Sequence, residues 1–458
     1  MDVGTVGGLM SGLDLVLRGR VVLPDGERLA AVGVADGRIA VVAGQHDAPL
    51  AAREDRTLGP DEVLIPGLVD THVHVNEPGR TEWEGFATAT AAAAAGGVTT
   101  IVDMPLNSIP PTVSPEALDV KRAAAAGVAA VDVGFWGGAI PSNLGRLRAL
   151  HDAGVFGFKC FLAPSGVDEF PHLDRAQLDA ALDELADFDG LLIVHAEDPD
   201  ALPHGYGGGR GYAGYLASRP DEAEVAAVEH VVEGVRRTGG GRTSCTCRAR
   251  RCCPCCGPRR PRGCGSRPRP ARTTSLDAAS VPDGATRFKC APPIRDSRNQ
   301  DLLWEALDDG TIDLVVTDHS PSTVELKTAG GGDFGVAWGG IAGLQLGLAA
   351  VWTQAARRGV PLARVVGWMA TATARFVGLD DRGAIAPGRR ADLAVVAPDA
   401  ELVVDPARLE HRNPVTAYDG ARLRGVVRET WLAGAPVRPG ERRGALLDRP
   451  VPAVLTAP

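Results

Sequence analysis

Two patterns of apolar and polar positions alternate along this chain of 458 residues. Near both ends, short apolar stretches are interrupted by turn residues. Ala31–Val34 and Arg38–Val41, for example, flank Asp36-Gly37, a pair typical of a hairpin turn. In between, apolar runs of strand length alternate with longer alanine-rich stretches such as Phe86–Ala95, which predict helices. The chain should therefore have strands at both ends and alternating strands and helices in the middle.

The two ends are expected to fold together, because both contain short strands of the same kind. We predict a small β-sandwich domain formed from both termini, with residues 1–62 as its N-terminal part and residues 385–458 as its C-terminal part. The expected strands are Leu15–Leu17, Arg20–Val22, Ala31–Val34, Arg38–Val41, Ala391–Val396, Leu402–Val404, Gly425–Val427 and Glu429–Leu432.

The middle of the chain, residues 63–384, predicts an α/β domain. Strands that alternate with helices favour a parallel sheet. Polar residues of metal-ligand type close several of these strands, which favours a (β/α)8 TIM-like barrel, whose sites lie at the carboxyl ends of its strands. Six of the eight strands can be recognised: Leu68–His74, Val98–Met104, Val131–Trp136, Val155–Leu162, Leu191–His195 and Ile312–Thr317.

The residues that close these strands suggest a metal site. His72 and His74 end the first run two positions apart, so both side chains point to the same face. His195 ends the fifth run, and Asp318 follows the sixth. A single histidine of this kind is as often an ordinary core residue, but four such residues at strand ends favour shared ligation of a metal.

Lys159 lies inside the apolar run Val155–Leu162. An isolated ammonium is costly there, so the side chain should be paired, shifted in pKa or modified. Alternatively, Lys159 is a surface lysine whose stem alone is buried. Among metal ligands, the modification that fits is a carbamate formed with carbon dioxide (N6-carboxylysine), an anionic group whose oxygens can bridge two metal ions. We therefore predict Lys159 as a metal ligand.

Composition narrows the setting. The net charge of -9 gives no reason to expect nucleic-acid binding. The sequence contains no run of eighteen apolar residues, the length needed to span a membrane. The N-terminus lacks a basic region followed by an apolar core, so we expect a cytoplasmic protein. Seven of the nine cysteines lie between Cys245 and Cys264, in a segment that differs from the rest of the chain.

That segment, residues 242–275, contains ten arginines but no lysine, histidine, aspartate or glutamate. A zinc or iron–sulfur module is one interpretation, although the cysteines lack paired and well-separated spacing. A disordered basic linker is another, although so long a loop is unusual inside a barrel. We expect that the segment as written cannot supply two barrel strands, because proline removes ladder donors at Pro254, Pro258, Pro261, Pro268 and Pro270.

A third interpretation is translation in the wrong frame. With GC-rich codons for Arg242–Arg248, reading from the last base of the first codon gives His-Val-Leu-His-Leu-Ser. The same shift, applied to permitted codons for Arg269–Thr274, gives Thr-Cys-Pro-His-Tyr. Both products are strand-like and contain histidine, and both fall where two strands are missing. We therefore predict a compensated double frameshift over residues 242–275.

Several motifs together resemble the cyclic amidohydrolases of the amidohydrolase superfamily, and within them the allantoinases. The resemblance covers nearly the whole chain outside residues 242–275, and the two shifted products are similar to the family's sixth and seventh strands. The motifs are Pro66–His74, Asn76–Arg80, Thr81–Gly85, Asp103–Asn107, Gly157–Phe161, Ala291–Arg295 and Thr317–Pro321.

The resemblance implies a binuclear metal hydrolase. His72, His74 and Asp318 would hold one divalent ion, most simply zinc. His195, the histidine lost from the sixth strand and the carbamate of Lys159 would hold the second. Asp318 would also be the catalytic proton shuttle, and the protein would be a homotetramer acting on a small molecule. Without the lost ligand, the written chain could instead be a metal-deficient, non-catalytic homologue.

The resemblance also bears on the substrate. Dihydroorotases have an arginine two residues after the second histidine, where it pairs with the substrate carboxylate, but this chain has Asn76. Asn76 suits a neutral ring such as allantoin, which would be hydrolysed to allantoate. Asn107 and Ser320 are further predicted substrate-binding residues. A hydantoinase (dihydropyrimidinase) and a dihydroorotase-type enzyme remain alternatives.

Other polar residues carry weaker expectations. His319 either supports Asp318 or caps a turn, and Gly330-Gly331-Gly332 is interpreted as a mobile loop near the active site, since no strand precedes it and no Lys-Ser/Thr pair follows it. The remaining histidines lack ligand spacing and are predicted to lie on the surface: His151, His172, His204, His230 and His411.

Overall fold

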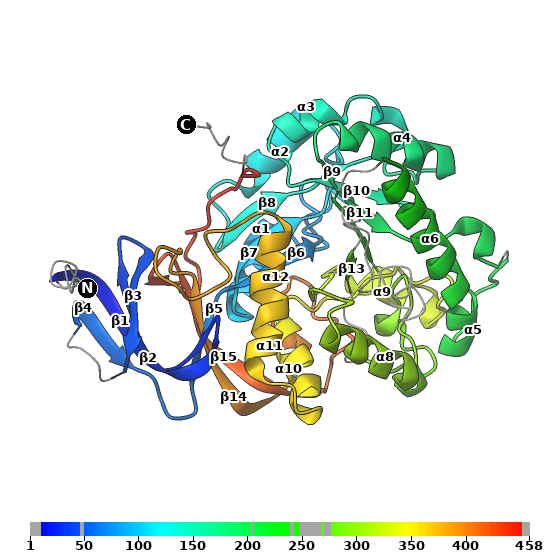
Figure 1. The fold of residues 1–458 in the computed structure, drawn as a ribbon. Helices are drawn as coiled ribbons and strands as arrows, with labels where there is room; N and C mark the ends of the chain where they lie inside the picture. The colour runs from blue at the N-terminus through cyan, green and yellow to red at the C-terminus, as the bar shows by residue number, and fades with distance from the viewer. Residues whose placement is uncertain are drawn as a thin grey trace.

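The structure is a computed structural model (Figure 1). It describes residues 11–45, 50–203, 205–238, 242–246, 267–269 and 276–450.

Strands from both ends of the chain join one eight-stranded sheet. The strands run in the order β16-β15-β14-β5-β1-β2-β3, with β4 beside β1, and the antiparallel pairing of β14 with β5 links the two ends. The expected hairpin turn is confirmed, since Asp36 and Gly37 have φ values of 50° and 71° between β2 and β3. The bounds are β1 (Ser11–Leu23), β2 (Gly26–Ala35), β3 (Arg38–Gly44), β4 (Ala51–Thr57), β5 (Val63–Pro66), β14 (Leu393–Val403), β15 (Arg422–Leu432) and β16 (Ala435–Pro436).

The middle of the chain contributes parallel strands in chain order. One sheet runs β6-β7-β8 and the other β9-β10-β11-β12-β13. Only Trp136 separates β8 from β9; its N–H donates to Asp103 O at 2.9 Å, and the next N–H donates to Gly157 O at 2.8 Å, so the chain passes from one neighbour to the other. The bounds are β6 (Leu68–Val73), β7 (Val98–Asp103), β8 (Asp132–Phe135), β9 (Gly137–Gly138), β10 (Phe158–Phe161), β11 (Leu191–His195), β12 (Arg242–Thr246) and β13 (Arg267–Arg269).

Helices alternate with these strands along the chain (Figure 1), and one buried apolar cluster contains residues of both the helices and the strands. The predicted helix Phe86–Ala95 is confirmed as α1. In the part of the chain that the structure describes, no helix is both long and apolar enough to cross a membrane. The α-helices are α1 (Phe86–Ala95), α2 (Pro115–Ala125), α3 (Leu147–Asp152), α4 (Arg175–Ala186), α5 (Tyr212–Ala217), α6 (Asp221–Thr238), α8 (Ser297–Asp308), α9 (Val324–Thr328), α10 (Gly347–Arg357), α11 (Leu362–Val366) and α12 (Ala372–Phe376).

The predicted strand Ile312–Thr317 is not a regular strand. The chain there makes an isolated parallel bridge from His319 to Val73. The carboxylate of Asp70 accepts from Thr317 N at 3.1 Å and from Thr317 Oγ1 at 2.5 Å, which holds the end of this run beside β6. Asp318 then takes a left-handed φ of 49°, which a regular strand does not contain.

The expectation that residues 242–275 cannot form two strands is wrong. Strand β12 pairs in parallel with β11, and β13 pairs in parallel with β12. No proline falls within Arg242–Thr246, and Pro268 lies in β13, the edge strand of its sheet, where a missing donor is tolerated. The other four prolines of the segment lie outside the described residues, as do all of its cysteines except Cys245.

Candidate active site

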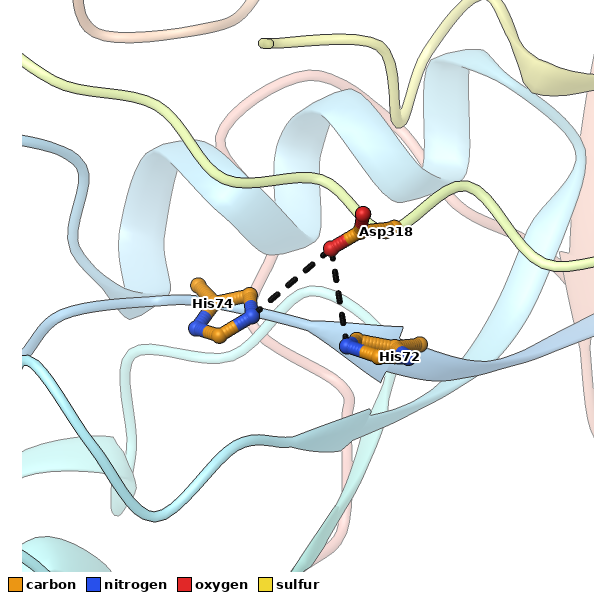
Figure 2. A group of neighbouring side chains, drawn as sticks. All are labelled: His72, His74 and Asp318. Carbon is orange, nitrogen blue, oxygen red and sulfur yellow. Dashed lines mark ion pairs between the residues drawn. The ribbon is translucent and has the colours of Figure 1, made fainter. Parts of the chain in front are cut away.

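Three predicted ligands converge at one end of β6. His72 Nε2 lies 3.5 Å and His74 Nε2 3.8 Å from Asp318 Oδ1, and ligand atoms of all three residues lie within 4.8 Å of one another (Figure 2). The alternation of a strand places both histidines on the same side, and the irregular segment before His319 brings Asp318 over them. All three residues are buried. Two imidazoles and a carboxylate form a donor set that fits a divalent metal.

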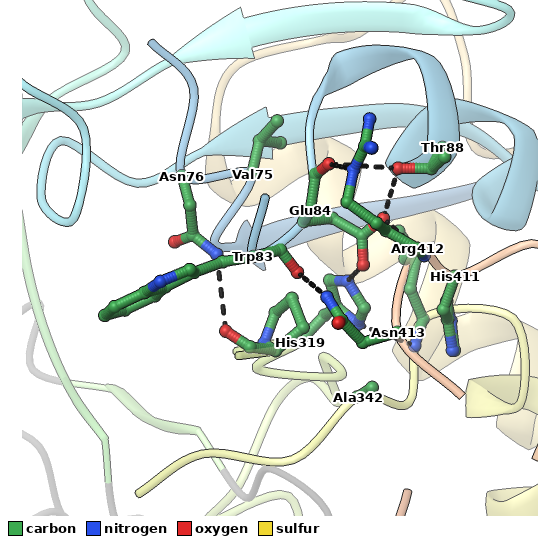
Figure 3. A network of polar contacts seen from close by, with 12 residues as sticks. Val75, Asn76, Trp83, Glu84, Thr88, His319, Ala342, His411, Arg412 and Asn413 are labelled. Carbon is green, nitrogen blue, oxygen red and sulfur yellow. Dashed lines mark hydrogen bonds and ion pairs between the residues drawn. The ribbon is translucent and has the colours of Figure 1, made fainter. Parts of the chain in front are cut away.

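His319, the residue after Asp318, is fixed on both sides of its ring. His319 Nδ1 accepts hydrogen bonds from Gly343 N at 3.1 Å and Leu344 N at 3.3 Å, so Nε2 carries the proton and donates to Glu84 Oε2 at 3.2 Å. Both side chains are fully buried, and Glu84 also contacts Thr88 and Arg412 (Figure 3). The His319 ring thus caps the turn that begins at Gly343, as one of the two sequence interpretations expects, and Glu84 anchors it next to Asp318 in the chain.

A second buried carboxylate, Asp70, lies beneath the histidines. It accepts from His72 N at 3.0 Å in addition to its two bonds from Thr317. Burial raises its pKa to about 6, and these three hydrogen bonds only partly oppose that rise. Asp70 thus links β6 to the segment that carries Asp318.

Lys159 and His195 lie on the neighbouring strands β10 and β11 and line the same cavity as the other three ligands. Lys159 is only 1% exposed, so it is not a surface lysine. Its Nζ lies 4.8 Å from the centre of the Phe161 ring, and the His195 ring stacks on that ring at 4.6 Å. The cavity has a volume of about 550 Å³. All five predicted ligands therefore face one space.

The sequence interpretation missed the partner of His195. His195 Nε2 lies 2.7 Å from Glu197 Oε2, and Arg219 Nη1 lies 2.5 Å from the same oxygen. Glu197 is fully buried; burial favours a raised pKa, but Arg219 and His195 outweigh it and lower the pKa to about 2. The ionised carboxylate fixes the orientation of the His195 ring. Its spacing, two residues after a strand-end histidine, was the available signal.

The predicted substrate residues are placed differently. Asn107 and Ser320 line the cavity. Asn76 is buried beside it, and its Nδ2 donates to Pro321 O at 3.4 Å. Asn76 and Asn107 have left-handed φ values of 68° and 65°, a costly conformation that often accompanies functional sites. Arg80 donates to Asn107 O at 2.9 Å and so ties the two motifs together.

Two histidines predicted to lie on the surface are buried. His151 is 8% exposed and packs on the Phe188 ring at 4.5 Å, and His411 is 6% exposed and packs on the His319 ring at 4.8 Å. His411 Nε2 also accepts from Gln345 N at 3.3 Å, so both histidines are packed residues of the interior. His172 and His230 are partly exposed, and His204 lies outside the described residues.

Comparison with known proteins agrees with this geometry. The amidohydrolase family model matches residues 63–437, and the chain belongs to this family, whose members use divalent metals. It is 55% identical over 457 residues to the allantoinase of Streptomyces avermitilis, covering 96% of this chain and 100% of that protein. It is 43% identical over 387 residues to the allantoinase of Saccharomyces cerevisiae, covering 82% of each.

Among solved structures, the chain is similar to the L-hydantoinase (dihydropyrimidinase) from Arthrobacter aurescens. The TM-score is 0.88 at 28% identity, and the match covers 95% of this chain and 100% of that one. The structural likeness therefore extends over both the central strands and the terminal sheet.

Proposed function

We propose that this amidohydrolase hydrolyses the ring amide of allantoin to give allantoate. Support comes from the two allantoinases above and from one observation of the site: His72, His74, Lys159, His195 and Asp318 face one cavity. Water adds to the ring carbonyl carbon, the ring C–N bond breaks, and the carbonyl becomes a carboxylate. The product is an open chain with two ureido groups.

The side chains divide the work. Two divalent ions, most simply zinc, would lower the pKa of the attacking water and polarise the carbonyl. His72, His74 and Asp318 would hold one ion, and Lys159 and His195 would contribute to the second. Asp318 takes the proton from the water and passes it to the leaving ring nitrogen. Asn107 and Ser320 would orient the ring from the cavity wall, and Asn76 would shape that wall from behind.

Lys159 would act as its carbamate. Burial favours the neutral amine of a lysine. The amine nitrogen forms a bond to the carbon of carbon dioxide and loses a proton, which gives an N-carboxylate. The carbamate would place an anion at this buried position, and two metal cations would balance its charge. Lys159 Nζ and the His195 ring both lie against the Phe161 ring, at 4.8 Å and 4.6 Å from its centre, which supports a common ion.

The activity test compares three cyclic amides with the purified protein loaded with zinc. Allantoin should be hydrolysed with a kcat/KM at least about 100-fold above those for hydantoin and dihydroorotate, a difference of about 2.7 kcal/mol. Comparable turnover of dihydroorotate, or no turnover of allantoin, would overturn the assignment. A hydantoinase activity is the second candidate, because the structural likeness to L-hydantoinase favours it.

We further propose that residues 242–275 are translated out of frame. The pairing of β12 with β11 puts Thr246 beside His195, and the second histidine of the shifted frame falls at positions 245 to 246. A ligand there would complete the second ion's site. Sequencing the gene across these codons tests the proposal; an intact frame would instead favour a metal-deficient, non-catalytic homologue.

The remaining architecture follows from the family. We propose that residues 67–384 form an eight-stranded (β/α)8 barrel, flanked by a β-sandwich from residues 1–66 and 385–458; the boundary moves from the expected residue 62 because β5 (Val63–Pro66) pairs with β1 and β14. The parallel order of the central strands and the shared terminal sheet support this. We also propose a homotetramer in the cytoplasm. Light scattering coupled to size exclusion would give the mass of the assembly, and a monomeric mass would refute the tetramer.

A further inference from the structure

Lys289 is a cationic residue of the cavity wall that the mechanism does not use. It follows the short 3-10 helix Thr286–Phe288 and lines the same cavity as the five predicted ligands. Its Nζ donates to Ala337 O at 2.5 Å and lies 5.6 Å from the centre of the Tyr215 ring. The Tyr215 hydroxyl in turn donates to Cys290 O at 2.9 Å, which fixes the ring. The side chain is thus half-buried and held at the wall.

Lys289 also holds the segment Phe334–Gly340, most of which lines the cavity. Its carbonyl oxygen accepts from Gly340 N at 2.9 Å and from Lys327 Nζ at 3.0 Å. Lys327 Nζ donates to Trp338 O at 2.8 Å as well. Both lysines therefore fasten this segment, but Lys327 is buried behind it and is not among the described residues that line the cavity.

The charged groups near Lys289 have hydrogen-bond partners of their own, so the Lys289 ammonium acts as a hydrogen-bond donor towards the cavity. Arg219, the neighbouring cation of the wall, is paired with Glu197 at 2.5 Å. The nearby carboxylate of Asp333 accepts from Gly209 N at 2.8 Å and Gly335 N at 2.6 Å. An ammonium has three N–H donors, and one of those of Lys289 points to Ala337 O. Burial, with Arg219, lowers the pKa of Lys289 to about 8. A half-buried ammonium gains most from a further acceptor oxygen.

We propose that Lys289 binds the ureido arm of the substrate by donating a hydrogen bond to its carbonyl oxygen. This rests on the proposed function, in which the ring amide lies against His72, His74 and Asp318. The arm is the part of allantoin that a bare hydantoin ring lacks, and its oxygen is an acceptor of the kind that the ammonium requires. Lys289 would then be a specificity-determining residue that selects cyclic amides with an acceptor-bearing arm.

The test compares Lys289→Met with the matched control Lys327→Met, because both changes weaken the fastening of Phe334–Gly340 but only the first alters the cavity wall. For each protein, kcat/KM for allantoin is measured together with the inhibition constant of hydantoin. Lys289→Met should lower kcat/KM for allantoin about 10- to 100-fold, because the hydrogen bond from the charged ammonium to the ureido arm is lost. It should change the inhibition constant of hydantoin less than about 3-fold, because hydantoin has no such arm. Lys289→Arg should recover part of the loss.

Lys327→Met should move both quantities by similar factors. If Lys289→Met weakens both equally, Lys289 is a structural fastener, and if it leaves both unchanged, Lys289 does not bind the arm; either result makes the proposal wrong. Thermal unfolding of each variant shows whether it folds, and an unfolded Lys289→Met is replaced by Lys289→Gln. A wild-type protein that binds hydantoin but does not hydrolyse allantoin overturns the proposed function itself, a result distinct from equal loss in the variant.

Discussion

The two halves of the candidate metal site are supported in different ways. His72, His74 and Asp318 rest on buried carboxylates, because Asp70 binds the backbone of His72 and of Thr317, and Glu84 binds His319 beside Asp318. The half with Lys159 and His195 has one carboxylate, Glu197, and borders β12, which begins the segment 242–275. The first half is therefore supported by buried carboxylates around its own ligands, whereas the second half depends on the neighbouring strand β12, whose segment has an unusual composition.

The largest expected effect comes from replacing Lys159, and it should distinguish the two halves of the metal site. Lys159→Ala removes the shared anion, so the protein should lose the second ion and at least about 1,000-fold in kcat, consistent with the loss of a metal-assisted step. Short carboxylic acids such as acetate should restore part of the activity by supplying oxygens. Metal analysis before and after addition of the acid checks this; full metal content in the variant without acid would contradict it.

A matched pair of changes tests the supporting carboxylates. Glu197→Gln should weaken metal binding at the His195 half by about 10- to 100-fold, because a neutral amide replaces the charged acceptor that orients the ring. Glu84→Gln keeps its shape and should lower activity while leaving metal at His195 in place, since it acts on the Asp318 half. Zinc titration followed by calorimetry measures both, and equal effects of the two variants on both sites would refute the division.

A smaller effect, on the pH dependence of stability, is expected at His151, which belongs to neither half of the metal site. Burial lowers the pKa of His151 to about 4 from 6.5, so the unfolded chain binds more protons between these values. Stability that is present above about pH 6.5 is therefore lost as the pH falls towards 4. His151→Phe should reduce this loss by about 1 kcal/mol, a discounted share of the shift. Urea unfolding at pH 7 and pH 5 measures it, and an unchanged pH dependence would contradict the assignment.

Much of this could be predicted because the signals are local. Apolar runs that end in His74 and His195 predicted strands β6 and β11, and Asp36-Gly37 predicted the hairpin of β2 and β3. Lys159 stood out because a cation in an apolar run is costly. Glu84 and Arg219 were missed because each meets its partner far along the chain, His319 in one case and Glu197 in the other. No periodicity marks such a pair.

The strands β12 and β13 were missed for a different reason. Composition predicted an irregular segment, yet Arg242–Thr246 pairs with β11 through backbone groups that do not depend on the side chains. The prediction Ile312–Thr317 failed in the opposite direction, because an apolar run cannot show that the distant Asp70 side chain binds Thr317 or that Asp318 has a left-handed φ. Backbone pairing and long-range acceptors decide these two regions.

One measurement tests the central claim most directly: anomalous diffraction at the zinc edge from crystals of catalytically active protein. The account predicts two zinc peaks, one bound by His72, His74 and Asp318 and one beside His195, with carbamate density on Lys159 between them. A fully metallated, active crystal in which Lys159 is an unmodified amine would contradict it.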